Sequence, residues 1–272
     1  MKLKLKVIIL ISLFVFSAFG LLSQKQTWTN KIGMEFVLIE PGSMLVGRFQ
    51  PTVGKPDQGV PPEMYKRAVE MAKKAAMPGF TAKIKQPYYI GKFEVTQQQW
   101  TKIMGNNPSV FKNDTSENRP VENITWSDAR KFVNKLNAMD KIYVYRLPTE
   151  FEWEYAARAD AQDDIPWKEI QASAVLSGTT PAKIGTKKPN AWGLYDMLGN
   201  VWEWVQDYYN EKIFADPIPP RSGKEHVLKG ASFTGDVKNA TYMTHAAGPG
   251  NGFDIGLRVV REVRPIKNKN IK

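Results

Sequence analysis

Apolar positions recur with helical spacing in the segment TWSDARKFVNKLNAM. Ala129, Phe132, Val133 and Leu136 occupy positions i, i+3, i+4 and i+7, which places them along one face of a helix. Polar residues fill the positions between them. The pattern predicts a helix over 125–139 whose apolar face is buried in a core.

Three predicted helix starts share one pattern, a threonine followed three residues later by a residue that caps the backbone. In such a capping box the threonine hydroxyl accepts a hydrogen bond from the third helical amide, and the side chain at that third position accepts one from the threonine amide. The pairs are Thr96–Gln99, Thr125–Asp128 and Thr149–Glu152. Aspartate has a shorter side chain than Gln or Glu, so we expect the second box to be looser.

The third of these helices carries a carboxylate at every second position of its first turns. Glu152 is its capping residue, whereas Glu150 and Glu154 share a different face. Trp153 and Ala157, four residues apart, indicate the face that packs in the core. Because the N-terminus of a helix stabilises negative charge, we interpret these glutamates as ordinary N-terminal charges.

Strand-like segments surround the helices. MEFVLI and MLVG are separated by the turn residues PGS, which predicts a β-hairpin near the start of the chain. KQPYYIGKFEV, VLKGASF and IGLRVVREV predict further strands, and residues 160–265 otherwise read as loop with frequent Pro and Gly. The layout is α+β with few helices, so many backbone groups need side chains, water or an ion as partners.

Residues 50–80 read as an insertion with its own helix over 63–77. Alanine, lysine and glutamate favour the helix, and its polar and apolar residues separate at helical spacing. The weakly apolar face consists of Met64, Ala68, Met71 and Ala75. This face either packs on its own domain or offers a docking surface to an envelope assembly.

The N-terminus has the form of a targeting segment. MKLKLK is cationic, VIILISLFVFSAFGLL is apolar, and small residues follow at positions where a signal peptidase cleaves. We predict a signal peptide over 1–23 and export to the periplasm or beyond the cell. The alternative is an uncleaved anchor helix, for which the apolar run is shorter than the roughly 20 residues that a full span requires.

The amino-acid composition excludes several classes of function. The 272 residues are 42% hydrophobic and 24% charged, which suits a domain with a sizeable core. The net charge of +11 comes from scattered lysines and a basic tail over 266–272, with no recognisable nucleic-acid reader, so we expect no nucleic-acid partner. The chain has no cysteine. That excludes thiolate catalysis, cysteine-ligated zinc, iron–sulfur clusters and attachment as a lipoprotein through an N-terminal cysteine.

Seven motifs in order resemble the formylglycine-generating enzyme (sulfatase-modifying factor) family. They are GKFEVTQQQW, MGNNPSVF, RPVENITWSDARKFVNKLN, YRLPTEFEWEYAARA, NAWGLYDMLGNVWEW, LKGASF and GLRVV. The resemblance implies one domain over 24–265, interrupted by the insertion. It also implies a C-type-lectin-like variant of the α+β class, with three or four helices and short antiparallel strands. Members include copper oxidases of sulfatase cysteines, non-haem iron enzymes, and binding or secretion modules.

The motif DMLGNVWEW resembles a calcium site of this family. The resemblance implies ligands at Asp196, Gly199, Val201 and Glu203, two through carboxylates and two through backbone carbonyls, as Ca²⁺ prefers. The alternative is a turn with surface carboxylates and no ion. A second calcium site of the family has no matching pattern in KEIQASAVLSGTTPAKIG.

The catalytic positions of the family depart from its pattern. Where copper-dependent members carry two cysteines after LKGASF, this chain carries Gly235 and Ala240. Copper(I) prefers soft thiolate ligands, so the resemblance argues against formylglycine generation by copper chemistry. An iron site would need imidazoles, and the chain has only His226 and His245.

A cleft remains where the family binds its substrate. The matching wall residues are Ser232 and Trp202, and the residues expected beside them are Gly235, Ala240, Tyr242, Asp254 and Asp236. His245 paired with Asp236 or Asp254 would make an acid–base couple. A structural histidine is the alternative.

Two functions remain open. The first is an exported, calcium-supported binding or accessory module for a peptide, a glycan or an envelope protein. The second is a family enzyme with altered iron or acid–base chemistry around Ser232 and His245.

Overall fold

A computed structural model describes residues 26–49, 59–75, 77–112, 118–161, 166–215, 217–237 and 240–263. The predicted signal peptide and the basic tail lie outside these ranges. Among the described residues, no helix has the length and apolar character needed to cross a bilayer.

The largest sheet has five strands in the order β1-β2-β5-β11-β6. Its strands are β1 (Thr27–Thr29), β2 (Glu35–Ile39), β5 (Tyr88–Gly91), β6 (Tyr143–Arg146) and β11 (Val260–Val263). The last strand of the described residues, β11, is therefore an interior strand of this sheet. Val260 lies opposite Ile90 on one side and Arg146 on the other, and both pairings are antiparallel.

A second sheet has the strand order β10-β7-β8-β9. These are β7 (Trp202–Tyr208), β8 (His226–Lys229), β9 (His245–Ala247) and β10 (Ile255–Leu257). β7–β8 and β8–β9 are antiparallel as predicted, but β10 runs parallel to β7. The DMLGNVWEW motif leads directly into β7, so its last three residues belong to this sheet.

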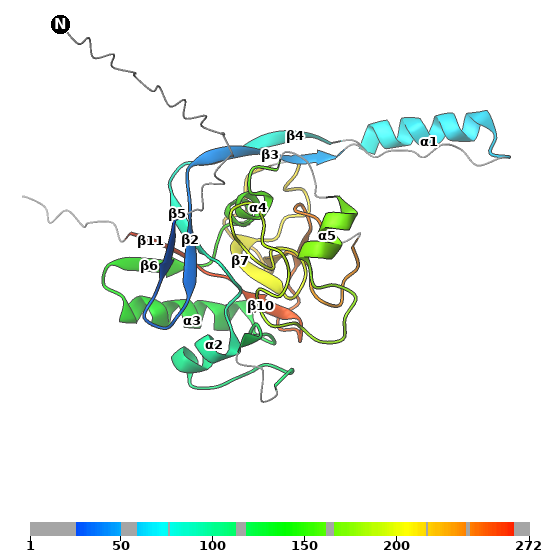
Figure 1. Ribbon diagram of the computed structural model, residues 1–272. Coiled ribbons are helices and arrows are strands. Elements are labelled where there is room, and N and C mark those ends of the chain that lie inside the picture. The colour runs from blue at the N-terminus through cyan, green and yellow to red at the C-terminus, as the bar shows by residue number, and fades with distance from the viewer. Residues whose placement is uncertain are drawn as a thin grey trace, which may run out of the picture.

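The predicted hairpin between MEFVLI and MLVG is wrong, although both segments are strands. β3 (Gly42–Phe49) pairs instead with β4 (Met77–Ile84), in a separate two-stranded ribbon. The Pro-Gly pair marks a bend that carries the chain from one sheet to the other, and such a local cue does not specify the partner. The helix of the insertion, α1 (Pro62–Ala75), connects these strands and projects away from the body (Figure 1).

The three predicted helix starts are confirmed. α2 (Gln97–Met104), α3 (Trp126–Met139) and α4 (Glu150–Arg158) each begin with a complete capping box. The box of Thr125 also has a bond from its hydroxyl to Asp128, at 2.6 Å. The shorter aspartate therefore closes this box fully.

The described residues form five helices, whereas three or four were expected. α5 (Trp167–Ser173) lies in the part of the chain interpreted as loop. It is seven residues long and begins at Pro166 without a side-chain cap, so neither a periodic pattern nor a capping box announces it. The mixed α+β class itself is confirmed.

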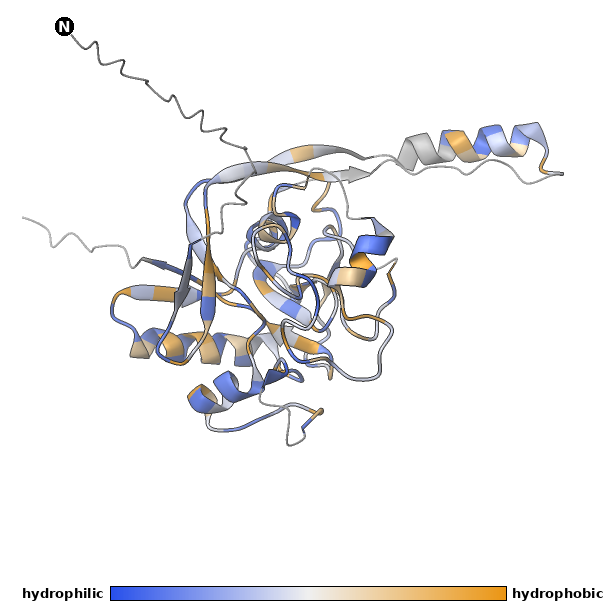
Figure 2. Cartoon of the chain, viewed as in Figure 1, coloured by the Kyte–Doolittle hydropathy of each residue, from blue (hydrophilic) through white to orange (hydrophobic). Residues whose placement is uncertain are grey.

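The core divides into two clusters on either side of the large sheet's central strands. One cluster contains Trp153 and Val205, and the other contains Trp100 and Phe132, whose rings stack at 5.1 Å. The predicted apolar face of α3 lies in the second cluster. Figure 2 shows hydrophobic bands alternating with hydrophilic ones along α3.

Candidate functional site

The structure brings Ser232, Trp202 and Asp254 together at one end of the second sheet. The Ser232 hydroxyl donates to Asp254 Oδ2 at 2.7 Å, and the Trp202 amide donates to the Asp254 carbonyl at 2.8 Å. Thr234 Oγ1 lies 3.2 Å from the same carboxylate oxygen. Ser232 is only 1% exposed, so its hydroxyl is a buried, hydrogen-bonded group.

The two positions that match the family's cysteines serve the backbone and the core. The Gly235 amide donates to the Ser232 carbonyl at 2.9 Å, and the Gly235 carbonyl accepts from the Ser177 amide at 2.9 Å. Ala240 is fully buried in the cluster that contains Trp153. Neither residue offers a metal ligand through its side chain.

His245 faces a different carboxylate from the two that were expected. Its Nδ1 lies 3.0 Å from Glu150 Oε1, without the alignment of a hydrogen bond. Tyr209 and Phe214 pack against the imidazole with ring centroids 5.1 and 4.9 Å away. The acid–base couple with Asp254 is thus a wrong prediction, because the Asp254 carboxylate binds Ser232 and His245 lies against α4.

His226 has separate surroundings. Its ring stacks on Trp126 at 3.5 Å and on Tyr208 at 4.2 Å. His245 lies on the neighbouring strand, β9. Its partner on β8 is Lys229, which comes three residues after His226. Within the described part of the chain, no group of three or more His, Asp or Glu side chains is arranged to hold a metal.

The Glu203 side chain of the calcium-like motif is buried against an arginine. Arg258 Nη2 lies 2.9 Å from Glu203 Oε1, and Trp153 Nε1 donates to Oε2 at 2.6 Å. Arg258 Nε also donates to Glu203, at 3.1 Å from each carboxylate oxygen. Its Nη1 and Nη2 atoms donate to the carbonyls of Gly91 and Tyr195, both at 2.8 Å. Sequence reasoning missed Arg258, whose only signal is its place in the GLRVV motif.

Two further carboxylates share this buried cluster. Glu94 accepts hydrogen bonds from Asn200 Nδ2 at 2.6 Å and from the Val201 amide at 3.1 Å. Asp196 Oδ2 accepts from the Gly185 amide at 2.7 Å, whereas its buried Oδ1 has no hydrogen-bond partner. Like Arg258, Glu94 was not identified from the sequence, because the contact spans more than a hundred residues.

The charges of this cluster do not balance. Burial, followed by the charges of Asp196 and Glu203, raises the pKa of Glu94 well above its usual value. Burial also raises the pKa of Asp196. With all three carboxylates ionised, one arginine leaves an excess of two negative charges, which one divalent cation would balance.

The backbone of the motif is tightly turned. Asp196, Gly199 and Asn200 adopt positive φ angles of 54°, 78° and 58°. A Cβ atom at Gly199 would overlap the carbonyl oxygen of Val175, so only glycine fits there. Left-handed conformations cost energy for residues other than glycine, and such strain concentrates at functional loops.

A second buried ion network joins α4 to β8. Glu154 accepts from Arg158 Nη2 at 2.7 Å and from Lys229 Nζ at 3.1 Å. Glu150 and Glu154 are 1% and 0% exposed. The interpretation of these glutamates as ordinary N-terminal charges is therefore incomplete, because Glu154 neutralises cations inside the core.

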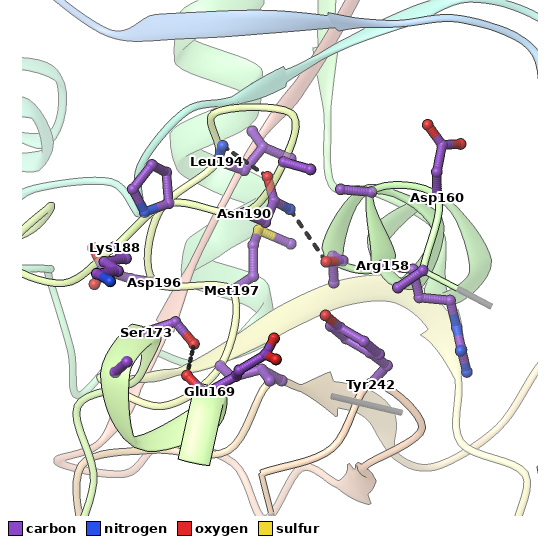
Figure 3. A pocket seen from close by; sticks show the side chains of 17 residues that line it. Arg158, Asp160, Glu169, Ser173, Lys188, Asn190, Leu194, Asp196, Met197 and Tyr242 are labelled. Atoms are coloured by element: carbon purple, nitrogen blue, oxygen red, sulfur yellow. Dashed lines mark hydrogen bonds between the residues drawn. The ribbon is translucent and has the colours of Figure 1, made fainter. Parts of the chain in front are cut away.

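A cavity of about 620 Å³ lies between the end of α4, α5 and the loop 188–198. Small apolar residues line it together with charged and polar ones. The alanines that line it are Ala157, Ala159, Ala161, Ala172 and Ala191. Tyr242 lies on this wall rather than beside Ser232 (Figure 3), so the residues expected in one cleft belong to two places.

Known proteins are similar to this chain over most of its length. Residues 23–263 match the Sulfatase-modifying factor enzyme 1-like domain. The Chaperone protein LppX of Paenibacillus barcinonensis is 31% identical over 232 residues, which cover 64% of this chain and 80% of that protein. The formylglycine-generating enzyme of Mus musculus is 33% identical over 140 residues, or 43% of this chain and 36% of the enzyme. The solved structure of Treponema denticola variable protein 1 has a TM-score of 0.64 at 26% identity, covering 89% of this chain and 99% of that one.

Proposed function

This chain belongs to the Sulfatase-modifying factor enzyme 1-like family, and on that basis we propose that it is an exported, calcium-supported binding or accessory module without formylglycine-generating activity. The observation that carries the proposal is the loss of both thiols, with Gly235 and Ala240 in their places. Gly235 bonds through its backbone and Ala240 fills the core.

The neighbourhood of Ser232 supports binding over altered catalysis. A serine nucleophile needs an adjacent base that another group orients. The Ser232 hydroxyl donates to Asp254, while His245 lies against Glu150. This arrangement holds a loop in place and does not activate an oxygen.

The cavity between α4 and α5 supports a ligand-binding role. Apolar pockets of several hundred Å³ with a few polar groups are the usual form of small-ligand sites. Here Met197 and the alanines supply the apolar wall, and Glu169 and Tyr242 supply polar groups. Such a cavity suits an apolar side chain of a peptide or an envelope protein better than it suits a bare glycan.

Calcium fits the DMLGNVWEW loop by the chemistry of its donors. Asp196 Oδ1 is a buried carboxylate oxygen with no hydrogen-bond partner. A divalent cation beside it would favour the ionised forms of Asp196 and Glu94, whose pKa values burial raises. Asp196 would hold the ion with the carbonyls of Gly199 and Val201. Glu203 would join them through a carboxylate that also accepts from Arg258 and Trp153. Bound there, calcium would neutralise the cluster and fix the loop that leads into β7.

The name of one relative is compatible with an accessory role. The similar protein from Paenibacillus barcinonensis is called a chaperone. The cationic and apolar segment at the start of the chain supports export.

Three measurements on the purified mature protein test the proposal. Elemental mass spectrometry should find calcium and no stoichiometric copper or iron. A sulfatase-motif peptide incubated with the protein should keep its cysteine, as judged by its mass. Stoichiometric copper or iron, or conversion of the peptide cysteine to formylglycine, would refute a non-redox module.

The cavity can be tested separately with the fluorescent probe anilinonaphthalene sulfonate. We expect saturable binding that Ala172→Phe abolishes, because a phenyl ring on α5 fills the cavity. Gln171→Phe places the same ring on the neighbouring, exposed position of α5 and should leave binding intact. Equal loss in both variants would exclude this cavity as the probe site.

A further inference from the structure

A second cavity, of about 500 Å³, lies where α3 meets β6, β7 and the loop before β8. It is distinct from the cavity beside α5 and from the Ser232 cluster. The charged and polar side chains that line it include Arg130, Asn134, Arg146, Asp207, Arg221 and His226. Three arginines and one aspartate thus line the same cavity.

One wall of this cavity is a stack of aromatic rings and a guanidinium group. Arg130 lies over the Trp126 ring at 4.9 Å, and the His226 ring stacks on Trp126 at 3.5 Å with an interplanar angle of 7°. Tyr208 covers the other side of His226 at 4.2 Å. The Trp126 indole also donates to the Val205 carbonyl at 2.9 Å. The stack therefore fixes Arg130 at the cavity wall.

The three arginines differ in how their charges are balanced. Arg146 is paired with Glu152 at 2.6 Å and with Glu262 at 3.4 Å. Within the described part of the chain, Arg130 and Arg221 take part in no ion pair with an acidic side chain. The guanidinium groups of these two arginines thus have N–H donors that no acidic side chain occupies.

We propose that this cavity binds a small oxyanion, the carboxylate, sulfate or phosphate group of a ligand, between Arg130 and Arg221. The planar fork of a guanidinium matches the geometry of these groups and binds them through paired N–H donors. A preorganised arginine loses less side-chain entropy on binding, and the stack on Trp126 provides that order. The Asn134 amide on the same wall adds a neutral polar group.

His226 contributes an acceptor rather than a charge. Its Nδ1 lies 3.2 Å from the carbonyl oxygens of Gln206 and Asp207. Carbonyl oxygens only accept hydrogen bonds, so the proton is on Nδ1 and the lone pair is on Nε2. Burial lowers the pKa of His226, which keeps the ring neutral near pH 7. The positive charge at the site therefore comes from the arginines alone.

Asp207 makes the site sensitive to pH. Its carboxylate accepts from the Glu150 amide at 2.6 Å, and burial with the charges of Glu150 and Glu152 raises its pKa to about 6. The groups facing it across the cavity are the three arginines and neutral His226. Because an ionised Asp207 repels an oxyanion, the bound anion should be held more tightly as the pH falls through 6.

The test is a titration of the full mature protein with sodium sulfate at constant ionic strength, followed through the arginine Nε–Hε signals by NMR. Sulfate remains a dianion over the whole pH range, so its own protonation does not intervene. We expect saturable binding, with Kd raised about tenfold by Arg130→Gln and by Arg221→Gln. Arg67→Gln, on the exposed polar side of α1, removes the same charge elsewhere and should leave Kd unchanged.

Further variants separate the proposed site from general charge effects. Arg130→Lys keeps the charge but loses the fork, so we expect an intermediate rise in Kd. Asp207→Asn keeps an acceptor for the Glu150 amide and should remove the pH dependence between 5 and 7.5. Parallel titrations with acetate and phosphate identify which oxyanion is preferred. Shifts that never saturate, or an equal effect of Arg67→Gln, would overturn the proposal whatever the fate of the cavity beside α5.

Discussion

Replacing Arg258 by methionine tests how the acidic cluster under the DMLGNVWEW loop is held together. Arg258 is 0% exposed, and its donors reach Glu203 and the carbonyls of Gly91 and Tyr195. Methionine fills much of the space of the Arg258 side chain, but it carries no positive charge to neutralise Glu203. Glu203, itself 1% exposed, would keep a buried charge with the arginine gone.

The expected cost follows from that burial. Removing one partner of a buried ion pair destabilises a protein by about 3–5 kcal/mol, because the remaining charge stays desolvated. For a domain of this size, each kcal/mol lowers the melting temperature by about 2–4 °C. We therefore expect Arg258→Met to lower the melting temperature by roughly 6–20 °C.

Thermal melting and urea unfolding, both followed by tryptophan fluorescence, measure this loss, with a matched surface variant as the control. Lys92 and Glu35 form an ion pair of 2.9 Å whose side chains are 25% and 42% exposed. Lys92→Met should cost less than about 1 kcal/mol. Adding Glu203→Gln to Arg258→Met should recover part of the loss, because the unpaired charge is removed with its partner. A loss below about 1 kcal/mol for Arg258→Met, or one equal to that of Lys92→Met, would refute the reasoning.

Three more outcomes are expected. Thr149→Ala removes a hydrogen bond of 3.2 Å to the Glu152 amide and should cost about 1 kcal/mol in urea unfolding; an unchanged midpoint would contradict the cap's role. The folded-state pKa of Asp207, about 6, exceeds the unfolded value of about 3.9, so this group's contribution to stability falls as pH rises through that window. Asp207→Asn should flatten that part of the pH profile, which repeated urea titrations would show. Chelation of calcium should lower the melting temperature of the wild type but not of Asp196→Ala, and equal responses would argue against the loop as the ion site.

Local chemistry determines most of what the sequence predicted correctly. The capping boxes of Thr96, Thr125 and Thr149 involve residues three apart, so nearby residues are enough to specify them. The buried face of α3 follows from periodicity in the same way. These elements also carry the motifs by which the family was identified.

The features that the sequence did not predict correctly involve contacts between residues far apart in the chain. Neither the pairing of β3 with β4 nor the meeting of Glu94 with Asn200 leaves a local trace, because each joins residues far apart in the chain. His245 was considered either as the partner of Asp236 or Asp254 or as a structural histidine, and the structure places it against Glu150 of α4. The strand register that places His245 opposite Lys229 is a property of the sheet, and no spacing in the sequence encodes it.

The position of β11 has a consequence for how the chain folds. Strands β5 and β6 flank it, so the large sheet is completed by nearly the last residues of the described chain. Non-local pairings of this kind slow folding, because a long loop must close before the contacts that stabilise it form. A nascent or truncated chain lacking residues 260–263 would expose the edges of both flanking strands, which are templates for aggregation. Synthesis and folding of this protein are therefore expected to be sequential, with cooperative folding beginning only after β11 is available.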